Sequence, residues 1–241
     1  MKDLKKIISE KKLFRSGMKN VVQYLLSKNI KLEELSGVEI FGGTGETDIF
    51  LAEKLKTFEI WEIDRSCFTE LKKKFSESKI DICNSIERLE KEDNESKFDI
   101  IVMDNPMNVY GTNKESTKYC EHFDVLKNIY KLIKKEAIVI FLVNKKPFFY
   151  NKLCEKNIIW KNRRKAFYGD IDVENLDSSF LIKFYEEYFK KNKFETIFSK
   201  NITRHQPHLD YFIFKIRKNE VKVINNIDWI SLNPLLERHK K

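Results

Sequence analysis

The chain has 241 residues, a formal net charge of +9, and 41% hydrophobic and 13% aromatic residues, a composition that suits one domain with a sizeable core. Its four widely spaced cysteines form no C-x-x-C pair, so we expect neither a zinc ribbon nor a disulfide framework, and a reducing, cytoplasmic location. No stretch approaches the roughly 18–20 apolar residues of a membrane helix, and the charged N-terminus lacks the apolar centre of a signal peptide, so no membrane partner is expected.

Apolar residues at three-to-four spacing predict two short helices before Val38, in a helical segment covering residues 1–36. Short apolar runs that end in loop residues then recur along the chain and predict strands. These runs are Val38–Phe41, Phe58–Ile63, Lys79–Cys83, Phe98–Met103, Ala137–Val143, Phe194–Ser199 and Leu209–Ile216. The segments between the first five runs, residues 46–56, 67–77, 85–92 and 120–136, have helical periodicity.

This alternation of strands and helices predicts a doubly wound α/β fold with a seven-stranded, mostly parallel sheet. The connection between the last two strands, residues 200–208, is too short for a crossover helix, so the last strand is expected to be antiparallel. The α/β domain then covers residues 37–217, with a basic and aromatic insertion at about residues 144–180. Residues 218–241 form a C-terminal tail.

The stretch VEIFGGTGE, which begins at Val38, places three of the seven glycines of the chain directly after the first predicted strand. Glycines at this point let a ligand approach the backbone, and the following helix N-terminus adds unpaired N–H donors, although many strand–helix turns need glycine for steric reasons alone. Glu62 ends the second strand 17 residues after Gly45. A carboxylate there can accept both ribose hydroxyls of an adenosine, and the alternative is a solvated acid at a strand end.

The glycine turn resembles the first motif of the class I S-adenosylmethionine-dependent methyltransferases, and FEIWEID, at residues 58–64, resembles their second motif. The resemblance spans about Val38 to Ile216, and the family's Rossmann-like sheet of seven strands also ends in an antiparallel pair. It therefore implies S-adenosyl-L-methionine as the cofactor. A dinucleotide-dependent oxidoreductase is the rival interpretation, but it would prefer G-x-G-x-x-G, and no third glycine follows Gly45 at that spacing.

The same resemblance implies a role for each matching residue. Glu39 would hold the methionine end of the cofactor, the glycines would pass under it, Glu62 would bind the ribose, and Asn84 with Ser85 would lie beside the adenine. Asn84 stands where the family usually has Asp. The implied cofactor-binding residues are Glu39, Gly42, Gly43, Gly45, Glu62, Asn84, Ser85 and Asp104.

The stretch FDIIVMDNPMNVYG, at residues 98–111, resembles the family's fourth motif, F-D-x-x-x-x-(D/N)-P-P-(Y/F/W), which occurs where an amino nitrogen receives the methyl group. Phe98 fixes the register and puts Asp104 at the acidic position and Pro106 at the second proline. Asn105 replaces the first proline and Met107 the aromatic residue. Tyr110, three residues further on, is a candidate to supply the ring.

Methyl transfer from a sulfonium needs an acceptor lone pair placed in line, about 3 Å from the methyl carbon. Two hydrogen-bond acceptors can restore the nucleophilicity of an exocyclic amine conjugated with a base ring. We expect Asp104 and the carbonyl group of Asn105 to play this part, with an aromatic ring stacked on the target. The alternative is that Asp104-Asn105-Pro106 only turns the chain after the strand.

Three histidines have ambiguous roles. His122 begins a predicted helix on the same side of the sheet and is a candidate base or substrate contact, although a lone histidine at a helix start is more often structural. His205 and His208 lie in the final hairpin and have no further apparent metal ligands, so no metal site is expected.

A segment rich in both basic and aromatic residues follows the fifth predicted strand. Basic side chains neutralise phosphates while rings stack on exposed bases, so this mixture favours a nucleic-acid partner, although core rings with solvated lysines are the alternative. The expected substrate-binding residues are Lys145, Lys146, Arg163, Arg164 and Tyr168.

The sequence thus predicts an S-adenosylmethionine-dependent methyltransferase that modifies an exocyclic amino group of an RNA or DNA base. Two alternatives remain. One is a methyltransferase acting on a small molecule or a protein side chain, and the other is a non-catalytic binding subunit with the same fold.

Overall fold

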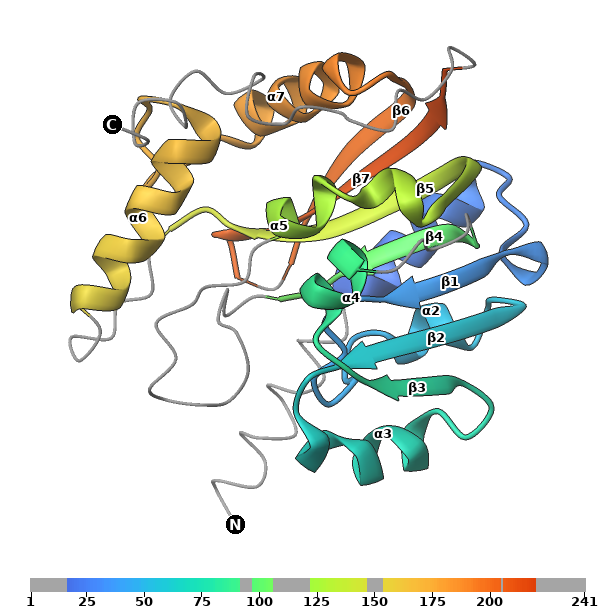
Figure 1. The fold of residues 1–241 in the computed structure, drawn as a ribbon. Coiled ribbons are helices and arrows are strands. Elements are labelled where there is room, and N and C mark those ends of the chain that lie inside the picture. The colour runs from blue at the N-terminus through green and yellow to red at the C-terminus, as the bar shows by residue number, and fades with distance from the viewer. Residues whose placement is uncertain (1–16, 92–96, 106–121, 147–153, 205, 220–241) are drawn as a thin grey trace.

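The structure is a computed structural model that describes residues 17–91, 97–105, 122–146, 154–204 and 206–219 (Figure 1). The described residues include one seven-stranded sheet with the strand order β3-β2-β1-β4-β5-β7-β6. The strands are β1 (Ser36–Glu39), β2 (Thr57–Glu62), β3 (Lys79–Ile82), β4 (Phe98–Met103), β5 (Ile133–Asn144), β6 (Phe194–Thr203) and β7 (Leu209–Lys218). Six of them contain all or most of a predicted apolar run, and β1 begins two residues earlier than predicted and ends at Glu39, midway through its run.

The pairing of the strands confirms the predicted sheet. β1 pairs in parallel with β2 and β4, β2 with β3, and β4 with β5. β7 is antiparallel to both of its neighbours, β5 and β6, and is inserted between them. The short connection after β6 leaves no room for a crossover helix, so the chain returns as a hairpin. The carboxyl ends of the five parallel strands β1–β5 therefore lie along one edge of the sheet.

Short helices connect the strands. They are a helix at residues 17–27, η1 (Leu32–Glu34), α2 (Ile49–Ala52), η2 (Arg65–Cys67), α3 (Phe68–Lys74), α4 (Ser85–Lys91), α5 (His122–Leu126), η3 (Ile129–Lys131), α6 (Cys154–Tyr168) and α7 (Ser178–Lys191). The predicted basic and aromatic insertion therefore contains α6 and the start of α7. In Figure 1, α6 lies beyond the strand ends, on the side toward which the arrowheads of β1, β2 and β3 point.

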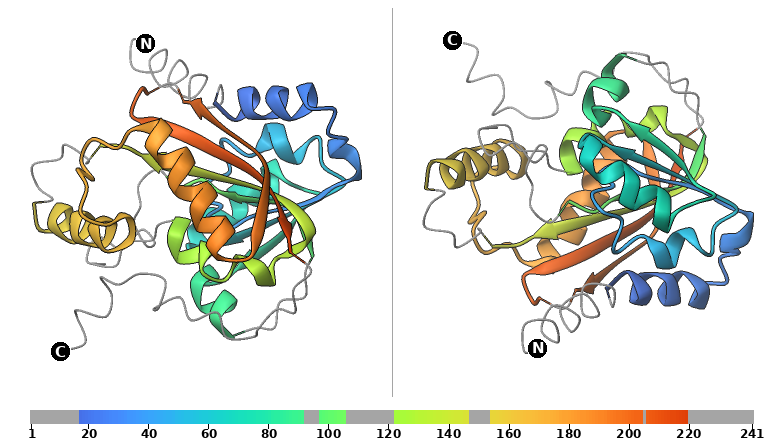
Figure 2. Two further views of the ribbon diagram at one scale, coloured as in Figure 1. Left: turned by 90° about the horizontal axis from the view of Figure 1, so that it is seen from above. Right: turned by 90° about the horizontal axis from the view of Figure 1, so that it is seen from below.

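Helices cover both faces of the sheet, and the alternation of side chains along each strand divides the core accordingly. On one face, Val38 and Phe141 pack with Leu89 of α4, Val125 of α5 and Tyr185 of α7. On the other face, the helix at residues 17–27 and α2 pack on the even-numbered residues of β4 and β5, and α3 packs on β2. Figure 2 shows the blue helix at residues 17–27 and the orange α7 on opposite sides of the strands. Glu39 and the residue after β4, Asp104, point to the face of α2.

One predicted helix extends too far. Helical periodicity continued to Glu136, whereas the structure has α5, one turn of 3-10 helix and then β5 from Ile133. Ile133 is fully buried and pairs with Phe98, and a register shift between Phe98 and Ile100 accommodates the early start of β5. Tertiary pairing with β4 therefore overrides the local helical pattern.

Several predictions fall outside the described residues. They concern the first N-terminal helix, Pro106, Tyr110, His205 and the tail after residue 219. Across the part of the chain that the structure does describe, no helix combines the length and apolar character needed to cross a bilayer.

Candidate functional site

The glycine turn after β1 uses its glycines for different purposes. Gly43 and Gly45 have positive φ values of 50° and 66°, and the turn is closed by the Gly45 N–H donating to the Gly42 carbonyl at 2.9 Å. A Cβ atom on Gly42 would lie 2.3 Å from Ile60, and one on Gly45 would lie 2.3 Å from Phe75. A Cβ atom on Gly43 would meet nothing within 4 Å. Packing thus explains Gly42 and Gly45, while Gly43 faces the open space where a ligand can reach the backbone.

Glu62 holds this turn in place from the end of β2. Its side chain is buried, with the residue 7% exposed, and its carboxylate accepts the backbone N–H groups of Gly43 and of Asp64. A carboxylate oxygen has two lone pairs, so each oxygen of Glu62 can accept a second hydrogen bond, as a ribose diol requires. The predicted ribose carboxylate therefore lies directly against the open side of the turn.

Glu39 and Asp48 form a buried pair of carboxyl groups behind the turn. Glu39 Oε1 accepts the N–H groups of Phe41 at 2.8 Å and Asp104 at 3.2 Å. Glu39 Oε2 and Asp48 Oδ1 are buried and have no hydrogen-bond partner among the residues that the structure describes. Burial, together with the charges of Asp48 and Asp104, raises the pKa of Glu39 well above its usual value. Burial and the charge of Asp104 raise the pKa of Asp48 to about 7, so the pair retains a proton near neutral pH.

Asp104 lies at the end of β4, and its carboxylate is hydrogen-bonded by three other side chains. Oδ2 accepts the hydroxyls of Thr47 and Tyr211, each at 2.6 Å, and Oδ1 accepts Arg204 Nη1 at 3.3 Å. The side chains of Asp104 and Arg204 are only 3% and 2% exposed. Burial and the Asp104 charge also raise the pKa of Tyr211 well above its usual value, which keeps the phenol protonated as a donor. The predicted role of Asp104 toward a substrate amine stays a prediction, because the carboxylate faces protein donors here.

Asn84 and Ser85 follow β3 and begin α4. The Glu87 N–H donates to Asn84 Oδ1 at 3.2 Å, and Asn84 Nδ2 donates to Glu87 Oε1 at 2.6 Å, so Asn84 holds the first turn of the helix. Ser85 is buried and donates to the Ile40 carbonyl at 2.6 Å, which ties α4 to the end of β1. Asn84 is thus the more accessible of the two residues that were predicted to contact the adenine.

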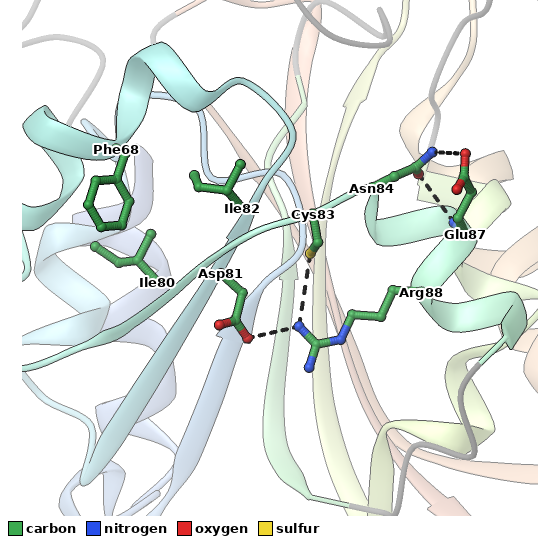
Figure 3. A pocket seen from close by; sticks show the side chains of 8 residues that line it. All are labelled: Phe68, Ile80, Asp81, Ile82, Cys83, Asn84, Glu87 and Arg88. Atoms are coloured by element: carbon green, nitrogen blue, oxygen red, sulfur yellow. Dashed lines mark hydrogen bonds and ion pairs between the residues drawn. The ribbon is translucent and has the colours of Figure 1, made fainter.

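A surface hollow of about 560 Å³ includes Asn84 (Figure 3). Its lining residues are Phe68, Ile80, Asp81, Ile82, Cys83, Asn84, Glu87 and Arg88. The hollow straddles the edge strand β3, with Phe68 and two isoleucines on one side and Arg88 on the other (Figure 3). The Arg88 guanidinium lies 4.1 Å from the Trp61 ring centroid and donates to Asp81 at 2.8 Å. The hollow lies beside Glu62 at Ile82 and Cys83, since Ile82 pairs with Glu62 in the sheet and the Cys83 N–H donates to the Glu62 backbone carbonyl at 2.8 Å.

Three of the predicted substrate-binding cations are engaged within the protein. Lys145 Nζ donates to Asp210 at 3.0 Å and to Ser178 at 2.9 Å, and Arg163 forms an ion pair with Asp124. Arg164 is fully buried and donates to the carbonyl group of Asn144.

The two other predicted substrate residues differ in exposure. Tyr168 is buried, and its hydroxyl lies 2.7 Å from that of Tyr185. Lys146 is exposed to solvent. A substrate contact therefore remains a prediction for all five residues, and Lys146 is the member whose side chain is accessible.

His122 lies inside the core and not at the site. It is 2% exposed, stacks on Phe141 with the ring centroids 4.6 Å apart, and is hydrogen-bonded to Tyr185. Burial and the neighbouring Arg164 charge hold its pKa well below the usual value, so the ring is neutral. These surroundings support the structural alternative for His122.

Sequence reasoning missed Asp48, Thr47, Arg204 and Tyr211. Asp48 and Thr47 are close to the glycine turn in sequence, and their position at the start of α2 was an available signal. Arg204 follows β6, and its side chain donates to Asp104, which lies 100 positions earlier in the chain. No local sequence pattern predicts a contact between residues so far apart.

Comparisons with known proteins support the fold. No protein-family model matches the sequence, and a search of curated proteins finds no match. The N-methyltransferase NodS from Bradyrhizobium japonicum WM9 is similar in structure with a TM-score of 0.52 at 12% identity, covering 86% of this chain and 97% of that one. The 1,6-didemethyltoxoflavin-N1-methyltransferase from Burkholderia thailandensis, solved with 1,6-didemethyltoxoflavin and S-adenosylhomocysteine, has a TM-score of 0.50 at 12% identity, covering 90% of this chain and 83% of that one. The strand order and these likenesses together show that the chain has the fold of the class I S-adenosylmethionine-dependent methyltransferases.

Proposed function

We propose that this protein is an S-adenosyl-L-methionine-dependent methyltransferase whose acceptor is an exocyclic amino group of a nucleic-acid base. The observation that carries the proposal is the open side of Gly43 next to the buried carboxylate of Glu62, at the carboxyl ends of β1 and β2. In open α/β sheets, ligands bind at this edge.

The residues at this edge fit the cofactor. Gly43 leaves space for a ligand, Glu62 retains lone pairs for two ribose hydroxyls, and Asn84 lies one strand further along the same edge. Glu39 Oε2 and Asp48 Oδ1 lie buried behind the turn without a hydrogen-bond partner among the described residues, so they can accept hydrogen bonds from the ammonium group of a ligand. When bound, the cofactor supplies a methyl group that is attached to a positively charged sulfur. After transfer, that sulfur is part of a neutral thioether.

The acceptor is expected beyond the end of β4, where Asp104 and Asn105 follow the strand. A carboxylate has about four lone-pair directions, and protein donors occupy three of them at Asp104. Thr47, Tyr211 and Arg204 thus fix the Asp104 side chain and, through it, the start of the following loop. In the proposal, the remaining acceptor capacity of Asp104 and the carbonyl group of Asn105 orient the amine.

A small-molecule acceptor is the second candidate. It is favoured by the internal pairing of Lys145, Arg163 and Arg164, which leaves these cations less able to neutralise phosphates. The net charge of +9 favours the nucleic acid. The same chemistry also suits a protein side chain as the acceptor.

Two experiments test the proposal in order. Isothermal calorimetry with S-adenosyl-L-methionine asks whether the cofactor binds, and an absence of binding would overturn the assignment. Transfer of tritiated methyl groups to total RNA, genomic DNA and a small-molecule extract then identifies the acceptor. Label found only in small molecules would rule out base methylation, and cofactor binding without transfer to any acceptor would favour a non-catalytic subunit.

A further inference from the structure

Helix α3 packs against the glycine turn at Gly45. A Cβ atom on Gly45 would lie 2.3 Å from Phe75 and 3.0 Å from Leu71, so the bare backbone of Gly45 is in close contact with these two side chains. Leu71 and Phe75 are both buried. The turn is therefore in contact with both α3 and the Glu62 carboxylate.

Lys74, the last residue of α3, adds polar contacts to this packing. Its ammonium group donates to the carbonyl oxygen of Thr44 at 2.7 Å, to Glu46 Oε1 at 2.6 Å and to Glu70 Oε1 at 2.6 Å. An ammonium group has three N–H donors, so these three acceptors use all of them. Thr44 lies between Gly43 and Gly45, the two residues with positive φ. The Lys74 side chain is 18% exposed, which places the ammonium group largely within the protein.

We propose that Lys74 is a positioning residue for the cofactor site, and this inference rests on the proposed function. A turn with three glycines loses more backbone freedom on ordering than a turn of the same length with fewer glycines. By holding the Thr44 carbonyl and the Glu46 carboxylate, Lys74 fixes the turn before the cofactor arrives. The entropy of ordering is then lost on folding and not on binding, which strengthens binding without a new contact to the ligand.

The alternative is an ordinary ion pair with a structural role. A pair with only a structural role contributes to the stability of the fold, and its loss leaves the affinity for a ligand unchanged while the protein is folded. Substitution of Lys74 is expected to change a different measured property in each case. Loss of a positioning residue weakens cofactor binding at temperatures where the protein is fully folded, whereas loss of a structural pair changes only the melting temperature.

The test compares Lys74→Met, which keeps the length and removes the charge, with Lys74→Arg and with Lys73→Met. Lys73 is the preceding residue and is exposed, so its substitution changes the net charge equally. Isothermal calorimetry measures the Kd for S-adenosylhomocysteine, and hydrogen exchange measures protection of the backbone amides of residues 42–47 without ligand. Thermal melting confirms that each variant is folded at the temperature used.

We expect Lys74→Met to raise the Kd about tenfold and to speed exchange in the turn, while Lys73→Met stays within about twofold of the wild type. Lys74→Arg retains the charge and is expected to recover most of the affinity. If the wild type binds and Lys74→Met has the same Kd, the inference is overturned while the proposed function stands. If the wild type itself does not bind, both are overturned.

Discussion

Glu62 ends β2 and Asp104 directly follows β4, at the same edge of the sheet, yet their carboxylates have different surroundings. Glu62 accepts two backbone N–H groups and lies against the open side of the turn. Asp104 is hydrogen-bonded by Thr47, Tyr211 and Arg204. Substitutions at the two positions are therefore expected to separate cofactor binding from turnover.

Glu62→Gln keeps the size of the side chain but leaves a single acceptor oxygen, and its amide group opposes one of the two backbone donors. Hydrogen bonds to charged groups contribute about 1.5–3 kcal/mol, so we expect the Kd for S-adenosyl-L-methionine to rise about 10- to 100-fold. Turnover at saturating cofactor should change much less. The control is Glu59→Gln on the same strand, where the side chain pairs with Lys79. Equal affinity in Glu62→Gln and the wild type would contradict the ribose assignment.

Asp104→Asn preserves the shape of the buried cluster and removes the charge that is expected to orient the amine. We expect turnover to fall about 100-fold while the Kd for the cofactor changes by no more than a few-fold, which single-turnover kinetics and calorimetry measure. Asp104→Ala is less informative, because it also removes the oxygen atoms that accept hydrogen bonds from Thr47, Tyr211 and Arg204 and so disturbs the buried cluster. Asp99→Asn, at the other end of β4, serves as the control. Full turnover in Asp104→Asn would remove Asp104 from the chemistry.

The glycines of the turn between β1 and α2 have different neighbours. Gly42 and Gly45 are in close contact with β2 and α3, so they determine how these elements pack. A Cβ atom on Gly43 would meet nothing within 4 Å, and this open side of its backbone is what the turn presents to a ligand. Stability and binding are therefore expected to depend on different glycines of the same turn.

Substitution of Gly43 or of Gly45 by alanine tests this division. Both substitutions place a side chain at positive φ, which costs on the order of 1 kcal/mol. Gly43→Ala adds no clash with the protein, so we expect a small loss in melting temperature but a large loss of cofactor affinity. Gly45→Ala forces Phe75 and α3 away and is expected to lower the melting temperature much further. Thermal melting with calorimetry distinguishes the two, and a Gly43→Ala variant with unchanged affinity would contradict the proposed position of the cofactor.

At the scale of the whole molecule, most of the fold was predictable because its strands are short apolar runs separated by loop residues. The antiparallel pairing of β7 with β6 was also predictable, since the residues after β6 are too few for a crossover. The start of β5 was not, because Lys131–Glu136 has helical periodicity and only the pairing of Ile133 with Phe98 determines its state.

The candidate site was predictable only in part. Gly43 and Glu62 lie in recognisable local motifs. The surroundings of Asp104 depend on Arg204 and Tyr211, which the sheet brings to it from the end of the chain. Likewise, the density of basic residues after β5 could not reveal that Arg164 is buried or that Lys145 pairs with Asp210.

The buried carboxyl pair should give the stability of the whole protein a distinctive pH dependence. Burial and the Asp104 charge raise the pKa of Asp48 from 3.8 to about 7. Interactions with Glu39, Arg204 and Thr47 lower the pKa, but by less. Between these pH values the folded state binds more protons than the unfolded state, so the free energy of unfolding falls as pH rises. From pH 5 to pH 8 the contribution of Asp48 falls by about 2–3 kcal/mol.

Asp48→Asn removes this titration, so the variant should lose less stability than the wild type over that interval. Urea unfolding at pH 5 and pH 8 measures the difference. Asp170→Asn changes a side chain that is 96% exposed and should behave as the wild type does. Parallel pH profiles for Asp48→Asn and the wild type would show that Asp48 does not carry the proton.

The contact between Arg204 and Asp104 joins two segments that the ribosome synthesises at different times. A ribosome completes β1, β2 and β4 long before it reaches the hairpin that carries Arg204 and Tyr211. Until that hairpin inserts β7 beside β5, the nascent chain has an acidic pocket without its balancing cation. A premature stop before residue 204 would therefore yield a protein that has its glycine turn but lacks the Arg204 and Tyr211 partners of Asp104.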